Sequence, residues 1–441
     1  MRLLQLVLLP LIFGAAQLHG QSPTPAASSS ADTVIHAGTL LDRPGKEPRR
    51  NVSILVKDGK IAAVQDGFVQ PAAGGAVIDL RDRFVLPGLI DCHVHLDSDR
   101  AGMEGQLASV TDSVAITAYE AAWNARKTLN AGFTTVRNVG NSDGVTLALR
   151  DAIAKGWATG PRILDAGSGI STTSGHMDPT LGFREELHPA LEAHATTCDG
   201  ADDCRRAVRK QISRGVDLIK IATTGGVNSR IGLGLGAQML DDEVKSIVET
   251  AHSYGKKVAV HAHGADGIAI ALRAGADSIE HGTLLDDAAL KLFLSTGAYY
   301  VPTLSTINGY MERIAANPDA YAPEVRKKID WRIGITGEAL RKAVPAGVKI
   351  AFGTDAGVSK HGRNADEFEL MVKHGMTPAA AIQAATVNAA DLLGLKDQVG
   401  TIEPGKSADL IAVAGDPLGD VTVLKKVGFV MKEGRVFKHD L

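Results

Sequence analysis

Two hydrophobic patterns divide this chain. Near both ends, short runs of β-forming residues alternate with polar ones, as in VSILVKDGKIAAV and VGFVMKEGRVF. The turns Lys57–Gly59 and Lys432–Gly434 between such runs favour β-hairpins. We therefore predict one small β-sandwich domain, assembled from residues 32–84 and 398–441.

The stretch from residue 85 to 397 follows a different rhythm. Short apolar runs that end in glycine or polar residues alternate with helical stretches such as DDEVKSIVETAHSYG and TPAAAIQAATVNAADLLG. The candidate strands are VLPGLIDCHVHL, GFTTVRNVG, RILDAG, DLIKIATTGG, KVAVHAHG, DSIEHG, AYYVPT and KIAFGTDAG. Eight strand–helix units are the number that closes a parallel barrel. The pattern predicts an α/β fold, a (β/α)8 TIM barrel over residues 85–397.

Length and charge fit this architecture and narrow the partners. A chain of 441 residues accommodates such a barrel and a small accessory domain. Its formal net charge of −3 gives no basic excess. We therefore expect a small-molecule or dipeptide substrate, and neither nucleic acid nor an anionic membrane surface as a partner.

The N-terminus has the three parts of a secretory signal. Arg2 precedes an apolar run from Leu3 to Phe13, and small residues follow at Gly14 to Ala16 and at Gly20. The run is too short to span a membrane. We predict a signal peptide at residues 1–20 and a disordered Pro/Ser/Ala-rich leader at residues 21–31. The protein is then exported, either periplasmic or secreted, and not membrane-bound after signal cleavage.

The three cysteines fit an exported protein. Cys198 and Cys204 bracket the polar segment CDGADDC, where a disulfide is expected in an oxidising compartment, with two free thiols as the alternative. Cys92 stands beside two histidines, but neighbours on a strand point to opposite faces. We interpret Cys92 as a buried core thiol.

Residues of the types that bind metals stand at the ends of the predicted strands, where TIM barrels carry their chemistry. His93 and His95 are two apart on one strand and therefore share a face. Later strands bring Lys220, His261, His263, His281 and Asp355. Singly, each has a structural explanation, such as a hydrogen-bonded core histidine or a turn aspartate. Together, imidazoles and a carboxylate at one barrel mouth favour zinc, with manganese, cobalt or iron as alternatives.

Several motifs are similar to those of one family. The stretches LPGLIDCHVHL, LIKIATTGG, VAVHAHG, SIEHG and FGTDAG, followed by GTIEPGKSADLIAV and GFVMKEGRVF, occur in this order. They resemble the amidohydrolase superfamily, in its branch of imidazolonepropionase-like and Xaa-Pro dipeptidase-like enzymes. The resemblance covers nearly the whole chain after the leader.

The resemblance implies a binuclear hydrolase of C–N bonds with two divalent metal ions, zinc in our prediction. His93 and His95 would bind the more buried metal, His261 and His281 the more exposed one, and Lys220 would bridge both as N6-carboxylysine. Asp355 would bind the first metal and carry the proton from the attacking water to the leaving nitrogen. His263 would help to hold the charge of the intermediate, or would have a structural role.

The substrate is less well defined by the sequence. Arg230 could hold a product carboxylate or be an exposed loop arginine, Tyr300 could orient the substrate or pack, and His176 could touch substrate or be solvated. The apolar loop GLGLGAQM after Arg230 suggests room for a bulky group. We predict cleavage of dipeptides or N-acyl amino acids with a hydrophobic or aromatic group, including ochratoxin-type amides.

Other functions remain open at this point. A cyclic-amide hydrolase of the dihydropyrimidinase or imidazolonepropionase type would share much of this ligand set, although Lys220 argues against mononuclear relatives and against a deaminase. A non-catalytic metal-binding barrel is the alternative of another class, but here every expected ligand position is filled. Relatives often form symmetric homo-oligomers, octamers included, so we expect a homo-oligomer.

Overall fold

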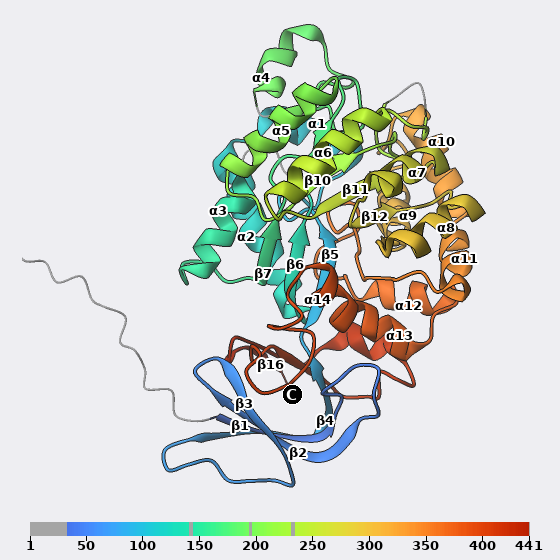
Figure 1. Ribbon diagram of the computed structural model, residues 1–441. Helices are drawn as coiled ribbons and strands as arrows, with labels where there is room; N and C mark the ends of the chain where they lie inside the picture. Colours follow the sequence, from blue (N-terminus) through green and yellow to red (C-terminus); the bar gives the residue numbers. More distant parts are fainter. Residues whose placement is uncertain (1–32, 141–143, 194–195, 231–233, 441) are drawn as a thin grey trace, which may run out of the picture.

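The computed structural model describes residues 33–140, 144–193, 196–230 and 234–440. A β domain occupies one end of the molecule, next to the C-terminus, and a larger α/β part rises above it (Figure 1). The predicted signal peptide (1–20) and leader (21–31) lie outside the described residues.

Segments from both ends of the chain share one sheet in the β domain. Its strand order is β16-β15-β14-β4-β1-β2-β3. The strands are β1 (Thr33–Leu40), β2 (Arg49–Lys57), β3 (Lys60–Asp66), β4 (Ala76–Pro87), β14 (Leu410–Val413), β15 (Phe429–Lys432) and β16 (Arg435–His439). The sequence predicted a sandwich of two sheets, whereas these described strands form one continuous sheet.

This sheet curls so that its two halves face a common core. Ile61 in edge strand β3 donates its backbone N–H to the carbonyl of Lys406, just before β14, at 2.9 Å. Side chains from both halves, among them Ile35, Val52 and Phe429, are fully buried in one cluster. A single curled sheet therefore encloses the hydrophobic core that two packed sheets were expected to enclose.

The α/β part contains two parallel sheets, with strand orders β5-β6-β7 and β13-β12-β11-β10-β8-β9. Their strands are β5 (Leu89–Val94), β6 (Phe133–Asn138), β7 (Arg162–Asp165), β8 (Ile170–Ser171), β9 (Thr196–Thr197), β10 (Ile219–Ala222), β11 (Val258–Ala262), β12 (Ser278–His281) and β13 (Tyr299–Val301). Seven of the eight predicted strand regions thus contain a strand in the described part of the chain.

The eighth predicted strand, residues 349–357, is irregular. Ile350 bridges to Tyr300 in β13, and Ala356 bridges to Val94 in β5, so the segment lies between the two sheets without pairing continuously. Asp355 has a φ of 56°, which is incompatible with extended backbone. Among the described residues the strands therefore form separate sheets, and no closed barrel is assigned.

Helices follow most of these strands and cover the sheets (Figure 1). They are α1 (Gly102–Thr111), α2 (Val114–Asn130), α3 (Val145–Ala154), α4 (His188–Glu192), α5 (Ala201–Ser213), α6 (Asp241–Ser253), α7 (Ala265–Ala274), α8 (Asp287–Thr296), α9 (Thr306–Ala316), α10 (Pro323–Gly334), α11 (Glu338–Ala346), α12 (Asp366–Lys373), α13 (Pro378–Gln383) and α14 (Ala389–Leu392), with η1 (Glu185–Leu187), the π-helical turn η2 (Ala384–Asn388) and η3 (Val421–Lys426). In the described ranges, no helix combines the length and apolarity that crossing a membrane requires.

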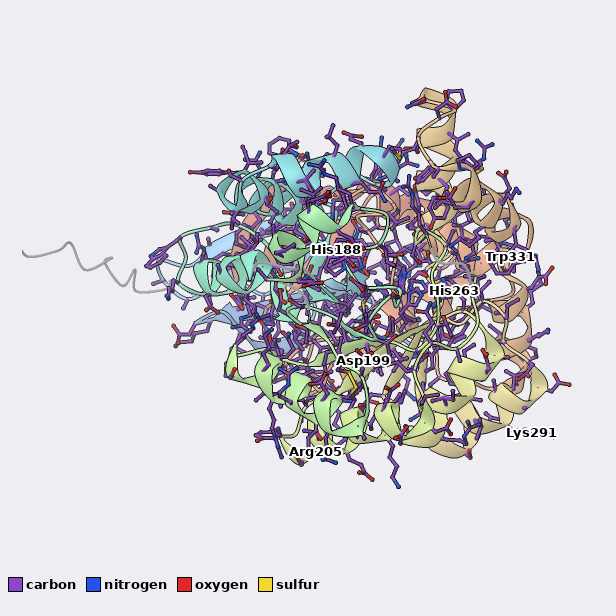
Figure 2. All side chains as sticks on the ribbon, turned by 90° about the horizontal axis from the view of Figure 1, so that it is seen from above. His188, Asp199, Arg205, His263, Lys291 and Trp331 are labelled. Carbon is purple, nitrogen blue, oxygen red and sulfur yellow. A yellow bond between two sulfur atoms is a disulfide. The ribbon has the colours of Figure 1, made fainter. Side chains whose placement is uncertain are left out.

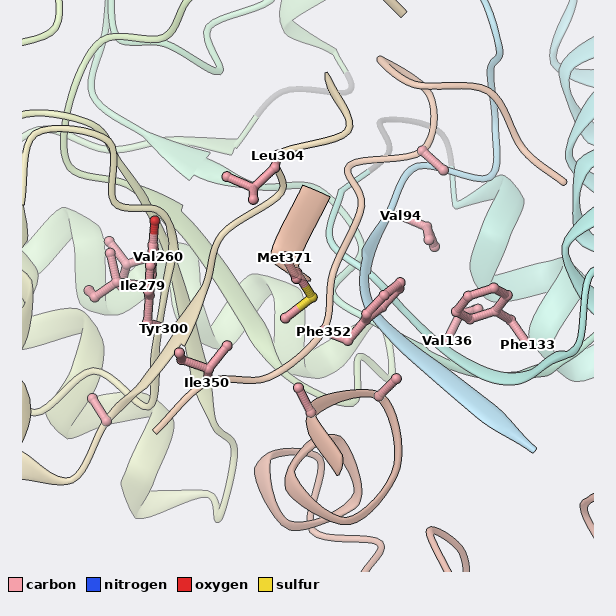
Figure 3. Packing of buried hydrophobic residues seen from close by; sticks show 14 of the residues in the cluster. Val94, Phe133, Val136, Val260, Ile279, Tyr300, Leu304, Ile350, Phe352 and Met371 are labelled. Carbon is pink, nitrogen blue, oxygen red and sulfur yellow. The ribbon is translucent and has the colours of Figure 1, made fainter. Parts of the chain in front are cut away.

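The main core lies between the sheets and the surrounding helices (Figure 3). Phe352, from the irregular eighth segment, packs between Phe133 of β6 and Phe368 of α12, with ring centroids at 5.5 and 4.4 Å. The segment is therefore anchored by its side chains, which fixes the position of Asp355 three residues later.

Cys198 and Cys204 form a disulfide at the start of α5. This agrees with the first of the two alternatives that the sequence left open. Cys92 is a buried free cysteine within an apolar cluster that includes Ile90 and Val301, as its position on the strand predicted.

Candidate active site

Three predicted metal ligands meet where β5 and the irregular eighth segment end. The Nε2 atoms of His93 and His95 lie 3.6 and 3.3 Å from Oδ1 of Asp355. One ligand atom from each residue lies within 4.8 Å of the others. This spacing is suited to a single divalent cation.

The other predicted ligands surround the same space. Lys220 of β10, His261 of β11 and His281 of β12 line a cavity of about 130 Å³ together with the His-His-Asp cluster. The rings of His93 and His281 lie 5.0 Å apart, and those of His261 and His281 lie 4.6 Å apart. We call this space the inner cavity.

Hydrogen bonds orient the imidazoles from behind. Nδ1 of His93 bonds Oε2 of Glu280 at 2.8 Å, and Nδ1 of His281 bonds the hydroxyl of Thr303 at 2.7 Å. Nδ1 of His95 donates to the carbonyl of Gly140 at 3.1 Å. Each of these rings therefore keeps Nε2 free for the cavity, which is the usual arrangement around metal-binding histidines.

Glu280 belongs to a fully buried charged network. Its Oε1 accepts hydrogen bonds from Arg137 at 2.7 Å and from the hydroxyl of Ser278 at 2.5 Å. Burial opposes its ionisation, but Arg137 and His93 lower the pKa of Glu280 to about 2. A carboxylate thus stands behind His93 and favours proton placement on Nδ1.

The backbone is strained at the site. His281, Thr303 and Asp355 have φ values of 70°, 48° and 56°. Non-glycine residues adopt this region rarely, and β-branched threonine is the least suited of the three. Such conformations persist where the surroundings enforce them, which is common at functional sites.

A second buried carboxylate holds the loop of Asp355. Asp91 accepts hydrogen bonds from the hydroxyl of Thr354 at 2.6 Å and from the side chain of Asn364 at 2.8 Å. Burial raises the pKa of Asp91 to about 6. This network positions the residue next to Asp355.

Burial keeps most basic groups of the inner cavity neutral or easy to neutralise. It lowers the pKa of His93 to about 4 and that of Lys220 to about 8, and it also lowers the pKa of His261 and His281. Neutral imidazoles are the form that binds metals. The donor set, the free Nε2 atoms and the buried carboxylate therefore fit divalent cations.

His263 and His176 both line the inner cavity. His263 lies inside the molecule, whereas Arg205 and Lys291 lie at its periphery (Figure 2). Nδ1 of His263 bonds the hydroxyl of Thr283 at 2.8 Å. His176 stacks on His261 with centroids 4.0 Å apart, so it is not the solvated loop histidine that the sequence left as an alternative.

Tyr300 and Arg230 lie outside the inner cavity. Tyr300 is buried in the core, and its hydroxyl donates to the carbonyl of His281 at 3.0 Å (Figure 3). Its position therefore agrees with packing and not with contact to a substrate. Arg230 pairs with Glu324 at 3.4 Å.

A larger outer cavity of about 500 Å³ adjoins the inner one. Both are lined by His95, Asn228 and Val358, so they meet at these side chains. The outer cavity also has apolar walls from Met103 and Val325, and Arg230 lies in its lining.

Sequence reasoning missed several residues of the inner cavity, among them Asn228, Tyr310 and Arg332. Tyr310 and Arg332 come from α9 and α10, and their helical context resembles ordinary packing. Glu280 was also missed, although an acidic residue inside the apolar strand SIEHG was a usable signal, because buried carboxylates require partners.

Comparisons with known proteins agree with this geometry. Residues 84–437 match the family described as the amidohydrolase family. The chain is 32% identical over 424 residues to the ochratoxinase of Aspergillus niger, covering 92% of this chain and 86% of that protein. It is 24% identical over 388 residues to an imidazolonepropionase of Geobacillus, covering 82% and 83% of the two chains.

Solved structures show the same relationship. A Xaa-Pro dipeptidase with bound methionine is 42% identical and has a TM-score of 0.86, covering 92% of this chain and 100% of that chain. The structure of A. niger ochratoxinase is 31% identical and has a TM-score of 0.79, covering 92% and 96%. At such identities, sequence and three-dimensional similarity extend over the α/β part and the β domain together.

Proposed function

Because this chain belongs to the amidohydrolase family and is thus a hydrolase of C–N bonds, we propose that it uses two divalent cations to cleave an amide bond in an N-acyl amino acid or a dipeptide. The substrate carries a hydrophobic or aromatic group. The observation that carries this proposal is the pair of adjoining cavities, one lined by metal-binding side chains and the other partly apolar.

The residues of the inner cavity divide the chemistry between them. Divalent cations held by these residues would supply Lewis acidity, which makes water a better nucleophile and a carbonyl a better electrophile. Asp355 is positioned to accept a proton from the attacking water and to deliver it to the leaving nitrogen. His263 and His176 border the same space and can donate hydrogen bonds to the carbonyl oxygen as it gains charge.

Lys220 has the surroundings that a carbamate requires. It is 3% exposed and lines the inner cavity. Its neutral Nζ would form an N–C bond with carbon dioxide and release one proton, giving an anion with two oxygens. In this proposal Lys220, in that form, would hold the cations together with His93, His95, His261 and His281.

The outer cavity supports the substrate class. Met103, Leu191 and Val325 present apolar surface there, close to the shared boundary at His95. A bulky acyl group in this space leaves its amide carbon next to the metal-binding residues. Ochratoxin-type amides therefore belong among the candidate substrates, in keeping with the similarity to ochratoxinase.

The proposal also covers architecture and location. The bridges of Ile350 and Ala356 support a closed (β/α)8 barrel, with the irregular segment as its eighth member. Export as a periplasmic or secreted protein is supported by the disulfide. A homo-oligomer is supported by the exposed apolar side chains of Leu107, Tyr119 and Trp123 on α1 and α2.

One experiment tests the hydrolase. Purified protein is assayed with N-acyl amino acids, dipeptides, an ochratoxin-type amide and cyclic amides, with and without a chelator, and its metal content is measured. We expect chelator-sensitive cleavage of the first three classes, with about two metals per chain. Lys220→Ala should lower metal content and activity together, at least about 100-fold in activity, and a short carboxylic acid should restore part of both.

The alternatives have distinct outcomes in the same assay. Turnover confined to cyclic amides would replace the proposed substrate class. Full metal occupancy without any turnover would favour a non-catalytic metal-binding protein. An unchanged rate in Lys220→Ala would refute its bridging role.

A further inference from the structure

The inner cavity contains a guanidinium that the hydrolysis described above does not use. Arg332, on α10, is 3% exposed and borders the same space as His263 and Asp355. Among the described residues, its side chain has one hydrogen bond, from Nη1 to the hydroxyl of Thr336 at 3.2 Å, and no ion pair. A buried arginine without a carboxylate partner is costly, so its presence at this position calls for an explanation.

The two carboxylates that attract Arg332 already have other partners. Glu367 accepts the backbone N–H groups of Leu304 and Ser305 at 2.9 and 2.6 Å. Asp355 directs Oδ1 at His93 and His95. Both carboxylates attract Arg332 from a distance, but neither forms a salt bridge with it. The free N–H groups of Arg332 are therefore available to an anion that enters the cavity.

Arg230, which the sequence indicated as a candidate for this role with an exposed loop arginine as the alternative, has a different environment. It pairs with Glu324, contacts the sulfur of Met103 and is 27% exposed at the outer cavity. Arg332 lies deeper, in the cavity that holds the predicted metal ligands. A planar guanidinium binds a carboxylate through two parallel hydrogen bonds, which fixes the orientation of the ligand.

We propose that Arg332 binds the free carboxylate of the substrate, adjacent to the scissile amide, and thereby restricts the enzyme to N-acyl amino acids and to dipeptides cleaved at a C-terminal residue. This inference rests on the proposed amide hydrolysis. The carboxylate enters the inner cavity, the acyl group remains in the outer cavity, and the amide lies between them at the metal-binding residues.

The test compares N-acetyl-L-phenylalanine with N-acetyl-L-phenylalaninamide, measured by acetate release. We expect the wild-type protein to prefer the acid by about 100-fold in kcat/KM, and Arg332→Gln to reduce this preference to about 3-fold by losing activity on the acid alone. Arg326→Gln, on the same helix but partly exposed and paired with Asp330, is the matched control. Metal content is measured for each variant and should not change.

The melting temperature distinguishes a carboxylate-binding role of Arg332 from a structural one. Since Arg332 is buried without an ion pair, Arg332→Met should raise the melting temperature by a few degrees. A structural arginine would lower it on replacement. Equal losses on the acid and the amide in Arg332→Gln, or a loss of the preference in Arg230→Gln instead, would overturn the proposal while leaving the hydrolase intact.

Ligand-binding measurements test the carboxylate site independently of the proposed hydrolysis. Calorimetry with L-phenylalanine and L-phenylalaninamide measures carboxylate recognition without turnover. If no amide is cleaved but wild-type protein binds the acid in preference to the amide and Arg332→Gln does not, the carboxylate site stands and the hydrolase fails. If the two ligands bind equally, or neither binds, the carboxylate site is refuted.

Discussion

The two adjoining cavities differ in how they are built. The inner one is formed by residues at the ends of β5, β10, β11 and β12 and in the irregular eighth segment, and its side chains are held by buried hydrogen bonds. The outer one is bounded by α1, α4, the start of α10 and loops, and α1 has no buried residue. At the far end from the β domain, α1 and α4 cover this side of the molecule (Figure 1).

This difference separates the hydrolytic chemistry from selectivity for the acyl group. Metal-binding groups need fixed directions, and strands with buried networks behind them provide those directions. A surface that accommodates an acyl group needs apolar area but no fixed side-chain directions. Substitutions on α1, which has no buried residue, should not destabilise the hydrophobic core. Substitutions of the metal-binding residues should therefore affect every substrate, whereas substitutions in the outer cavity should affect only substrates with large acyl groups.

The largest effect is expected from Asp355→Asn in the inner cavity. An amide cannot accept the proton of the attacking water, and it is a poorer metal ligand than a carboxylate. We expect kcat to fall by about 10²- to 10⁴-fold for all cleaved substrates alike. Asp202→Asn, whose side chain is 98% exposed, is the control. Near-normal turnover in Asp355→Asn would move the base to another residue.

A smaller effect on function is expected from Glu280→Gln, because Glu280 contacts the predicted metal ligand His93 and not the substrate. The change leaves Arg137 buried without a carboxylate and weakens the hold on His93. We expect a loss of about 3–5 kcal/mol in unfolding free energy, measured by urea denaturation. Metal affinity should fall about 10- to 100-fold.

The double variant Glu280→Gln, Arg137→Met tests the cause. The second change removes the buried charge of Arg137, which has no carboxylate partner in Glu280→Gln. It should recover part of the unfolding free energy but not the metal affinity. Stability that stays at the level of the single variant would show that Arg137 is not the source of the loss.

The inner cavity was also the part that the sequence predicted well. His93 and His95 follow from the period of two along a strand, and His261, His281 and Asp355 from their places at the ends of predicted strands. The structure brings all of them, with Lys220, to one cavity. The eighth strand was predicted less well, since the positive φ of Asp355 interrupts an otherwise apolar run.

Residues that reach the site from helices could not be predicted in this way. Arg332 and Tyr310 occupy helical stretches where polar and apolar residues alternate as they do on any surface helix, so only the fold shows which face turns inward. Tyr300 illustrates the opposite case. It precedes the end of a strand, as the ligands do, but its ring belongs to the core.

The smallest effect is expected in the outer cavity, from Met103→Ala. Met103 lines this cavity and is 47% exposed, so its removal should change unfolding free energy by no more than about 0.5 kcal/mol. We expect kcat/KM to fall about 3- to 10-fold for an N-naphthoyl amino acid and to stay unchanged for the N-acetyl compound, because only the larger acyl group reaches Met103. Leu107→Ala, on the same helix but outside the cavity lining, should leave both values unchanged. Equal losses for the two substrates would mean that α1 acts on the inner cavity, and the separation of chemistry from selectivity would not hold.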